Sequence, residues 1–159
     1  MHGAVLAIIV VYLLYRFIKW LVEIPARRRR EALMRTVALS GVDGMTGREF
    51  EEYVLQVLKH RGFTGYLTST SGDHGADIIA TRNGTRYAIQ CKRSRRTIGR
   101  QAVSEAVGAK ANYGCTGSMV ITNSWFSHQA RDHARATGTV LVDREGLAMW
   151  ITEIREKEK

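Results

Sequence analysis

The apolar residues that follow residue 46 recur at helical spacing. Phe50, Val54 and Leu58 fall on one face of a helix, as a period of 3.6 residues requires. Thr46 precedes this run, and Glu49 stands three residues after Thr46. This spacing is the pattern of a capping box. The sequence therefore predicts an amphipathic helix that begins after Thr46 and packs one face against a core.

Beyond this helix, short apolar or alternating runs predict strands separated by turns and helices. The expected strands are residues 64–70, 76–81, 85–93, 118–124 and 138–143. The expected helices are residues 100–113, 127–137 and 145–154. Asn83-Gly84, between the second and third strands, is a strong signal for a two-residue hairpin turn. A hairpin followed by alternating helices and strands predicts an α/β fold with a mixed central sheet flanked by helices.

The first 24 residues are mostly apolar. No charge occurs from Gly3 to Tyr15, and the basic run Arg27–Arg30 follows the apolar segment. A bilayer span needs about 20 mainly apolar residues, and basic residues flank its cytoplasmic end. We expect a single-pass transmembrane helix at 1–24, which would anchor the chain to the lipid bilayer of a bacterial-type cell membrane and leave the rest in the cytoplasm.

Two other interpretations of this segment stay open. Three charged residues interrupt its second half, so it also suits an amphipathic helix lying on the membrane surface. A buried helix of the downstream domain is the other alternative. A cleaved signal peptide is disfavoured, because its charges would precede the apolar segment.

The chain then divides into the anchor at 1–24, a basic juxtamembrane helix and linker at 25–45, and an α/β domain at 46–159. The formal net charge is +9. Residues 46–159 hold 17 basic against 12 acidic residues, so the domain is basic in its own right. A basic domain suits a polyanionic partner.

The two cysteines, Cys91 and Cys115, are too far apart for any zinc-ligand spacing. We expect both to be buried, reduced thiols.

Polar side chains gather at one end of the predicted hairpin. Gln90 and Lys92 share one face of the third strand, and Asp77 begins the second strand roughly across from them. A carboxylate and an amide oxygen are ligands for Mg²⁺, and an ammonium can assist an attacking water. The same pattern also suits a buried Asp–Lys ion pair that ties the hairpin together, and the spacing alone favours this second interpretation.

Five separated segments resemble the Mrr-type restriction endonuclease domain of the PD-(D/E)xK nuclease group. They are DGMTGREFEEYVLQVLKHRGF, SGDHGADIIA, AIQCKR, VITNSWFSHQARDHA and VLVDREGL, in that order, within about residues 43–152. The resemblance implies a restriction-endonuclease-like nuclease domain at 46–159 that cleaves DNA with Mg²⁺, Mn²⁺ being an alternative ion.

The resemblance also implies roles for individual residues. Asp77 matches the metal-binding aspartate, and Lys92 matches the catalytic lysine. Gln90 stands where the wider group has Glu or Asp, as a catalytic and metal-binding residue. Glu51, after Phe50, best matches the acid that the family's first helix supplies to the metal.

The residues after Lys92 are candidates for DNA binding, because a basic cluster beside a metal site suits a phosphate backbone. They are Arg93, Arg95, Arg96, Arg100 and Gln101. Upstream, Asp73 and His74 suit a loop-structuring turn better than a second metal shell.

The resemblance implies defence against foreign DNA. A repair or recombination nuclease acting on branched DNA is an alternative, and a non-catalytic, membrane-tethered DNA-binding module is another. Cutting both strands ordinarily needs two copies of a site, so a homodimer is expected.

Overall fold

The computed structural model describes residues 12–17, 19, 39–68 and 75–157. A compact unit spans Val37–Lys159 and carries the elements of the α/β domain. Its helices are η1 (Val42–Gly44), α2 (Gly47–His60), α3 (Arg100–Asn112), α4 (His128–Thr137) and α5 (Arg144–Lys157). Its strands are β1 (Thr64–Leu67), β2 (Ile78–Arg82), β3 (Thr85–Lys92), β4 (Gly117–Thr122) and β5 (Val140–Val142).

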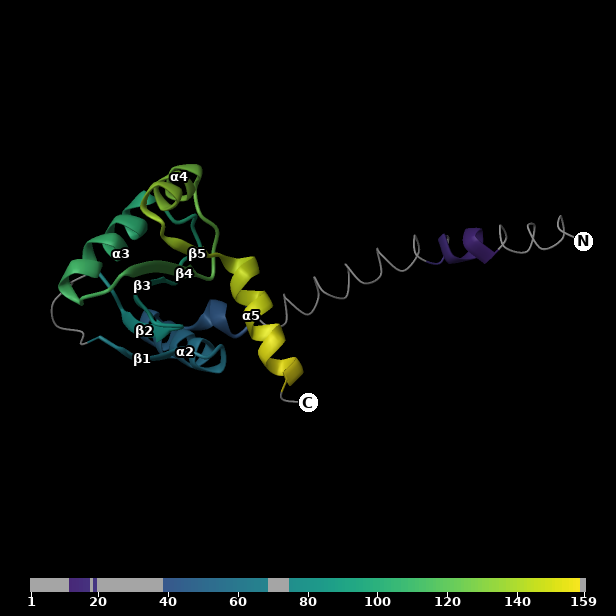
Figure 1. The fold of residues 1–159 in the computed structure, drawn as a ribbon, viewed down its shortest axis with the longest axis horizontal. Coiled ribbons are helices and arrows are strands. Elements are labelled where there is room, and N and C mark those ends of the chain that lie inside the picture. The colour runs from purple at the N-terminus through teal and green to yellow at the C-terminus, as the bar shows by residue number, and fades with distance from the viewer. Residues whose placement is uncertain (1–11, 18, 20–38, 69–74, 158–159) are drawn as a thin grey trace, which may run out of the picture. The chain divides into compact units, whose positions relative to one another are not determined.

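The five strands form one mixed sheet in the order β1-β2-β3-β4-β5 (Figure 1). β1, β2 and β3 are antiparallel neighbours, whereas β4 and β5 add parallel to β3. The turn between β2 and β3 has positive φ at both Asn83 (50°) and Gly84 (77°), as a type I′ hairpin turn requires. The predicted hairpin and mixed sheet are confirmed.

Helices cover both faces of the sheet, as Figure 1 shows for α3 and α4 on one side and α2 and α5 on the other. On the second side, Phe50 and Leu58 of α2 and Leu147 of α5 join a core with Ile89 and Ile121 of the sheet. The α3–α4 side is filled largely by alanines in two smaller clusters. The small side chains let both helices lie close to the sheet.

The start of α2 follows the predicted capping box. The Thr46 side chain accepts a hydrogen bond from the Glu49 backbone N–H (3.3 Å), and the Thr46 N–H donates to the Glu49 carboxylate (2.7 Å). The box satisfies backbone donors that the first helical turn leaves without partners.

Most element boundaries differ from the sequence prediction by one to three residues, and two of these differences lie at the polar end of the hairpin. β2 begins at Ile78, so Asp77 lies immediately before the strand and does not begin it. The chain therefore bends at Asp77, just before β2 begins. This bend turns the Asp77 side chain toward β3. β3 ends at Lys92, one residue earlier than expected.

Most of the predicted anchor at 1–24 and of the segment 25–45 lies outside the described residues, as do Asp73 and His74. Among the residues that the structure does describe, no helix is both long and apolar enough to cross a lipid bilayer. Both cysteines are free thiols; Cys91 is buried as expected, and Cys115 is half-buried.

Candidate active site

Asp77 is held at the mouth of the β2–β3 hairpin by its backbone. Its N–H donates to the carbonyl of Ile89 (2.9 Å), and its carbonyl accepts from the N–H of Thr68 (2.9 Å). These bonds extend the pairing of β2 with β1 and β3 by one residue before the start of β2. They fix the direction of the Asp77 side chain.

One carboxylate oxygen of Asp77 accepts two short hydrogen bonds. The backbone N–H of Cys91 donates to Oδ2 at 2.7 Å, and Nε2 of Gln90 donates to the same atom at 2.6 Å. Gln90 is 7% exposed, so its amide would be costly to bury without such a partner. Asp77 and Gln90 are therefore a preformed pair, and the Gln90 amide oxygen takes no part in these two hydrogen bonds.

Glu51 of α2 brings a second carboxylate to this place. It is half-buried, and its side chain contacts Arg48 (3.3 Å). Burial raises the pKa of Glu51, and the nearby negative charge of Asp77 raises it further. The two predicted metal-binding acids thus lie close enough to repel each other.

Lys92 is the last residue of β3. Its ammonium forms an ion pair with a residue that the sequence interpretation did not single out. Its Nζ lies 2.7 Å from Oε2 of Glu105 on α3. Gln101, one turn earlier on α3, donates to the other oxygen of Glu105 (2.9 Å). Glu105 could have been noticed only as the residue four positions after Gln101 on a predicted helix, and nothing in the sequence joins it to Lys92.

A close approach between the backbones of Gly75 and Glu105 positions the Lys92–Glu105 pair. Gly75 adopts φ +74°, and a Cβ at this position would stand 2.5 Å from the carbonyl oxygen of Glu105. Only glycine leaves room for this contact. The chain just before Asp77 therefore packs directly on the α3 turn that carries Glu105.

The donors fit a hard divalent cation. Asp77 and Glu51 supply carboxylate oxygens, and Gln90 supplies an amide oxygen. Among the described residues, no three His, Cys, Asp or Glu side chains converge as a metal cluster. A divalent cation here would therefore be bound by two carboxylates, the amide and water. Mg²⁺ commonly binds through one or two carboxylates and keeps several waters. The repulsion between Glu51 and Asp77 is what such an ion would relieve.

The Cys91 side chain is not a candidate nucleophile. The thiol is buried on the α2 side of β3. Burial raises its pKa well above the ordinary value, and the charges of Asp77 and Glu51 add to that effect. A thiol that stays protonated is inert, so Cys91 contributes its backbone N–H.

The arginine-rich loop after β3 is anchored from behind. The N–H of Ser94 donates to Oδ1 of Asn123 (2.8 Å), and Oγ of Ser124 donates to the carbonyl of Arg96 (2.9 Å). The predicted DNA-binding residues Arg95, Arg96, Arg100 and Gln101 are exposed, whereas Arg93 is half-buried.

The contacts behind this loop extend to an ion pair between η1 and α5. Asp43 of η1 accepts two 2.8 Å hydrogen bonds from Arg144 of α5 and one of 2.9 Å from the Asn123 side chain. The hydrogen bonds from Arg144 hold the pKa of Asp43 below its ordinary value. We call Asp43, Asn123 and Arg144 the supporting triad.

The chain resembles known proteins over most of its α/β domain. Residues 42–151 match the Mrr_cat family, described as restriction endonuclease. The type IV methyl-directed restriction enzyme EcoKMrr of Escherichia coli (strain K12) is 34% identical over 113 residues, which are 65% of this chain and 37% of that enzyme. The chain thus matches well under half the length of this relative.

Solved structures share the fold. The MspJI restriction endonuclease in complex with a 27-mer oligonucleotide has a TM-score of 0.55 at 22% identity, over 79% of this chain and 31% of that chain. The DNA modification-dependent restriction endonuclease AspBHI has a TM-score of 0.51 at 14% identity, over 84% and 40%. AF1548, a protein of unknown function, has a TM-score of 0.56 at 22% identity, over 67% and 65%.

Proposed function

Because the chain belongs to the Mrr-type restriction endonuclease family, we propose that it is a metal-dependent endonuclease that hydrolyses DNA phosphodiester bonds and serves in defence against foreign DNA. One observation carries the proposal. The Asp77 carboxylate is preformed by Gln90 and by the Cys91 N–H, with Lys92 at the end of the same strand.

Each residue then has a part in the reaction. Asp77, Glu51 and the amide oxygen of Gln90 would hold the ion, Mg²⁺ or in its place Mn²⁺. Bound there, the ion would stabilise negative charge on the phosphoryl oxygens and make a bound water more acidic. Lys92 orients the attacking water, and Glu105 holds the Lys92 ammonium in place.

The exposed arginines of the loop after β3 supply the DNA contacts. Arg95, Arg96 and Arg100 stand beyond the end of β3, where they can neutralise phosphates on either side of the scissile bond. Gln101 also donates a hydrogen bond to Glu105, the carboxylate that holds Lys92.

The anchor at 1–24 remains part of the proposal, on the strength of its apolar sequence and the basic run that follows. It would confine cleavage to DNA near the inner face of the membrane. A homodimer would provide the two sites that double-strand cutting needs.

The test uses the full chain in a non-ionic detergent, together with Lys92→Ala and Asp77→Asn. Plasmid, linear and branched DNA are incubated with Mg²⁺, Mn²⁺ or EDTA. We expect cleavage that needs the metal and falls at least about 10³-fold in both variants, because each removes a group acting at the reacting centre.

Glu145→Gln, an exposed change on α5, is the matched control and should cut at the unchanged rate. Equal DNA binding by the chain and its variants without any cleavage would instead support a tethered binding module.

A further inference from the structure

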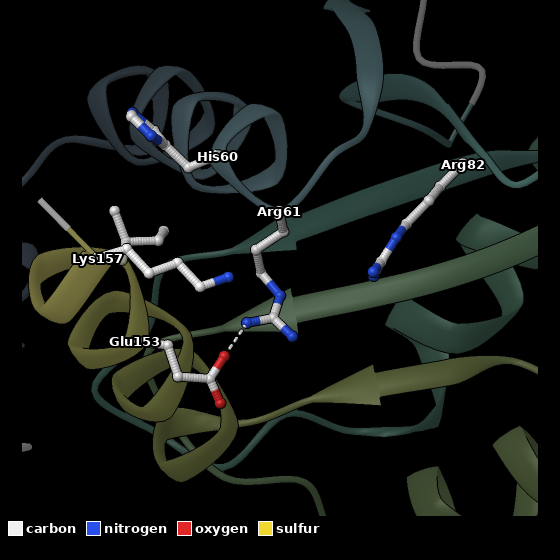
Figure 2. Close-up of a pocket in the computed structure, with 6 residues that line it drawn as sticks. His60, Arg61, Arg82, Glu153 and Lys157 are labelled. Carbon is white, nitrogen blue, oxygen red and sulfur yellow. Dashed lines mark hydrogen bonds and ion pairs between the residues drawn. The ribbon is translucent and has the colours of Figure 1, made fainter.

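A small basic concavity lies away from the candidate active site, among the end of α2, the end of β2 and α5 (Figure 2). Its volume is about 120 Å³. Six residues line it: His60, Arg61, Arg82, Glu153, Ile154 and Lys157. We call it the α2–α5 pocket. Arg82 ends β2, whereas Asp77 precedes that strand, so the pocket is at the opposite end of the hairpin from the Asp77 carboxylate.

Two guanidinium groups in the pocket are oriented by aromatic rings. Arg61 stacks over Trp150 at 4.5 Å from the ring centroid, and Arg82 lies over Phe63 at 5.2 Å. Figure 2 shows Arg61 between Arg82 and Lys157, whose side chains extend toward it. Ring stacking holds a guanidinium plane in place while leaving its charge and its edge donors available.

The charges in the pocket do not balance. Arg61 forms an ion pair with Glu153 through Nη1, and Glu153 is the one carboxylate among the described residues that line the pocket. Among the described residues, no carboxylate pairs with Arg82 or Lys157. The Nε of Arg61 is buried and has no hydrogen-bond partner there. Three cations therefore share one anion, and hydrogen-bond donors remain for a further acceptor.

We propose that the α2–α5 pocket binds a phosphate group of DNA, separately from the phosphate that is cleaved. Its volume is below the roughly 300 Å³ of pockets that take whole small molecules, so it suits one phosphate group and not a nucleotide. Guanidinium forks match the geometry of phosphate oxygens, and Lys157 adds a mobile charge.

The distance to the active site also suits DNA. β2 spans five residues, which places the two sites roughly 17 Å apart along the strand. A duplex rises that far in about five base pairs. The identification of DNA as the bearer of the phosphate rests on the proposed function. The capacity to bind a phosphate group does not.

The first experiment tests the site with inorganic phosphate. Phosphate is added to the full chain in dodecyl maltoside while the Nε–H signal of Arg61 and the indole signal of Trp150 are followed by NMR. We expect both signals to shift with saturation. The shifts should vanish in the double variant Arg82→Gln/Lys157→Gln and persist in Arg135→Gln/Lys110→Gln, which removes the same charge from α3 and α4. Unshifted signals in the unaltered chain would overturn the site.

The second experiment asks whether DNA supplies the phosphate. Binding of a fluorescent duplex is measured in EDTA over a range of salt concentrations. The pocket double variant should bind about tenfold more weakly and lose about one unit of the salt slope relative to the control double variant. Equal loss in both double variants, with phosphate binding abolished in the pocket variant alone, would overturn DNA as the ligand and leave free phosphate.

Cleavage separates this proposal from the catalytic one. The pocket variant should keep the turnover rate at saturating DNA and need a higher DNA concentration to reach it. Lys92→Ala should lose turnover and keep the phosphate-induced NMR shifts. A lost turnover rate in the correctly folded pocket variant would contradict a purely binding role for the pocket.

Discussion

At the scale of single residues, Lys92 depends on a carboxylate from another element. The pair with Glu105 fixes an ammonium that would otherwise rotate on a flexible four-carbon stem. Glu105→Gln keeps the size of the side chain and removes its charge. We expect the single-turnover cleavage rate to fall about tenfold with DNA affinity unchanged, since the change acts on positioning.

Glu145→Gln provides the matched control for this prediction too. A rate unchanged by Glu105→Gln would show that Lys92 is positioned without its partner. Reduced DNA affinity at an unchanged rate would place Glu105 in the binding surface instead.

Glu51 gives a second prediction at this scale. Its raised pKa means that the folded state holds the proton more tightly than the unfolded state. Glu51 therefore costs stability as pH rises through and above its ordinary pKa, and the cost is complete once pH exceeds the raised value. In EDTA at pH 7, Glu51→Gln should increase the unfolding free energy by up to about 1 kcal/mol.

The same variant should need far more Mg²⁺ for cleavage, because one of the two carboxylates is lost. Urea unfolding in EDTA and a Mg²⁺ titration of cleavage measure the two effects. If the Glu51→Gln chain is destabilised and its cleavage has the normal Mg²⁺ dependence, Glu51 does not bind the metal.

At the scale of elements, the supporting triad joins η1, α5 and the chain after β4 behind the arginine-rich loop. Asp43→Ala leaves Arg144 without its bidentate partner, and we expect a loss of about 1–2 kcal/mol. The value is modest because the Asp43 side chain is 43% exposed. Urea unfolding followed by tryptophan fluorescence, to which Trp125 under Arg144 contributes, measures it.

The pH dependence of this loss has a definite sign. The pKa of Asp43 is lowered in the folded state, so its contribution is complete above the ordinary value of 3.8 and disappears as pH falls through the lowered pKa. The stability difference between Asp43→Ala and the unaltered chain should be constant from pH 7 to about 5 and shrink toward pH 3. A difference that grows in acid would contradict the ion pair.

The elements themselves could be predicted because local patterns determine them. Thr46 with Glu49 set the start of α2, and Asn83-Gly84 set the β2–β3 turn. The partners of the site residues could not be predicted in the same way. Asp43 and Arg144 are 101 residues apart, and Lys92 meets Glu105 only because α3 crosses back over β3. Such pairs depend on packing between elements, which a period of 2 or 3.6 residues does not encode.

The position of Asp77 is an intermediate case. The strand that begins after it and its partner Gln90 follow from the hairpin register, in which Ile78 pairs with Ile89. The bend before Ile78 does not follow, because it depends on the hydrogen bond from Thr68 of the neighbouring segment to the Asp77 carbonyl.

At the scale of the whole molecule, the chain combines a basic α/β domain with the apolar segment at 1–24. If that segment is an anchor, the full chain should sediment with membranes and resist extraction by high salt. Deleting residues 1–30 should release the protein and leave the turnover rate within about twofold of the full chain, because these residues lie outside the compact unit that carries the site. A full-length chain found in the supernatant without detergent would contradict the anchor.

The position of β3 between an antiparallel and a parallel neighbour also orders events during synthesis. The β2–β3 hairpin needs no residue beyond Lys92, because a two-residue turn joins its strands. Thr122, whose hydroxyl donates to the Lys92 carbonyl, is made 30 residues later. At about 5–20 residues per second, the ribosome takes roughly 2–6 s over that interval. A chain terminated soon after Lys92 would thus carry the proposed metal ligands but neither Glu105 nor β4, so the proposed DNA-cutting centre would be completed only when most of the domain has been translated.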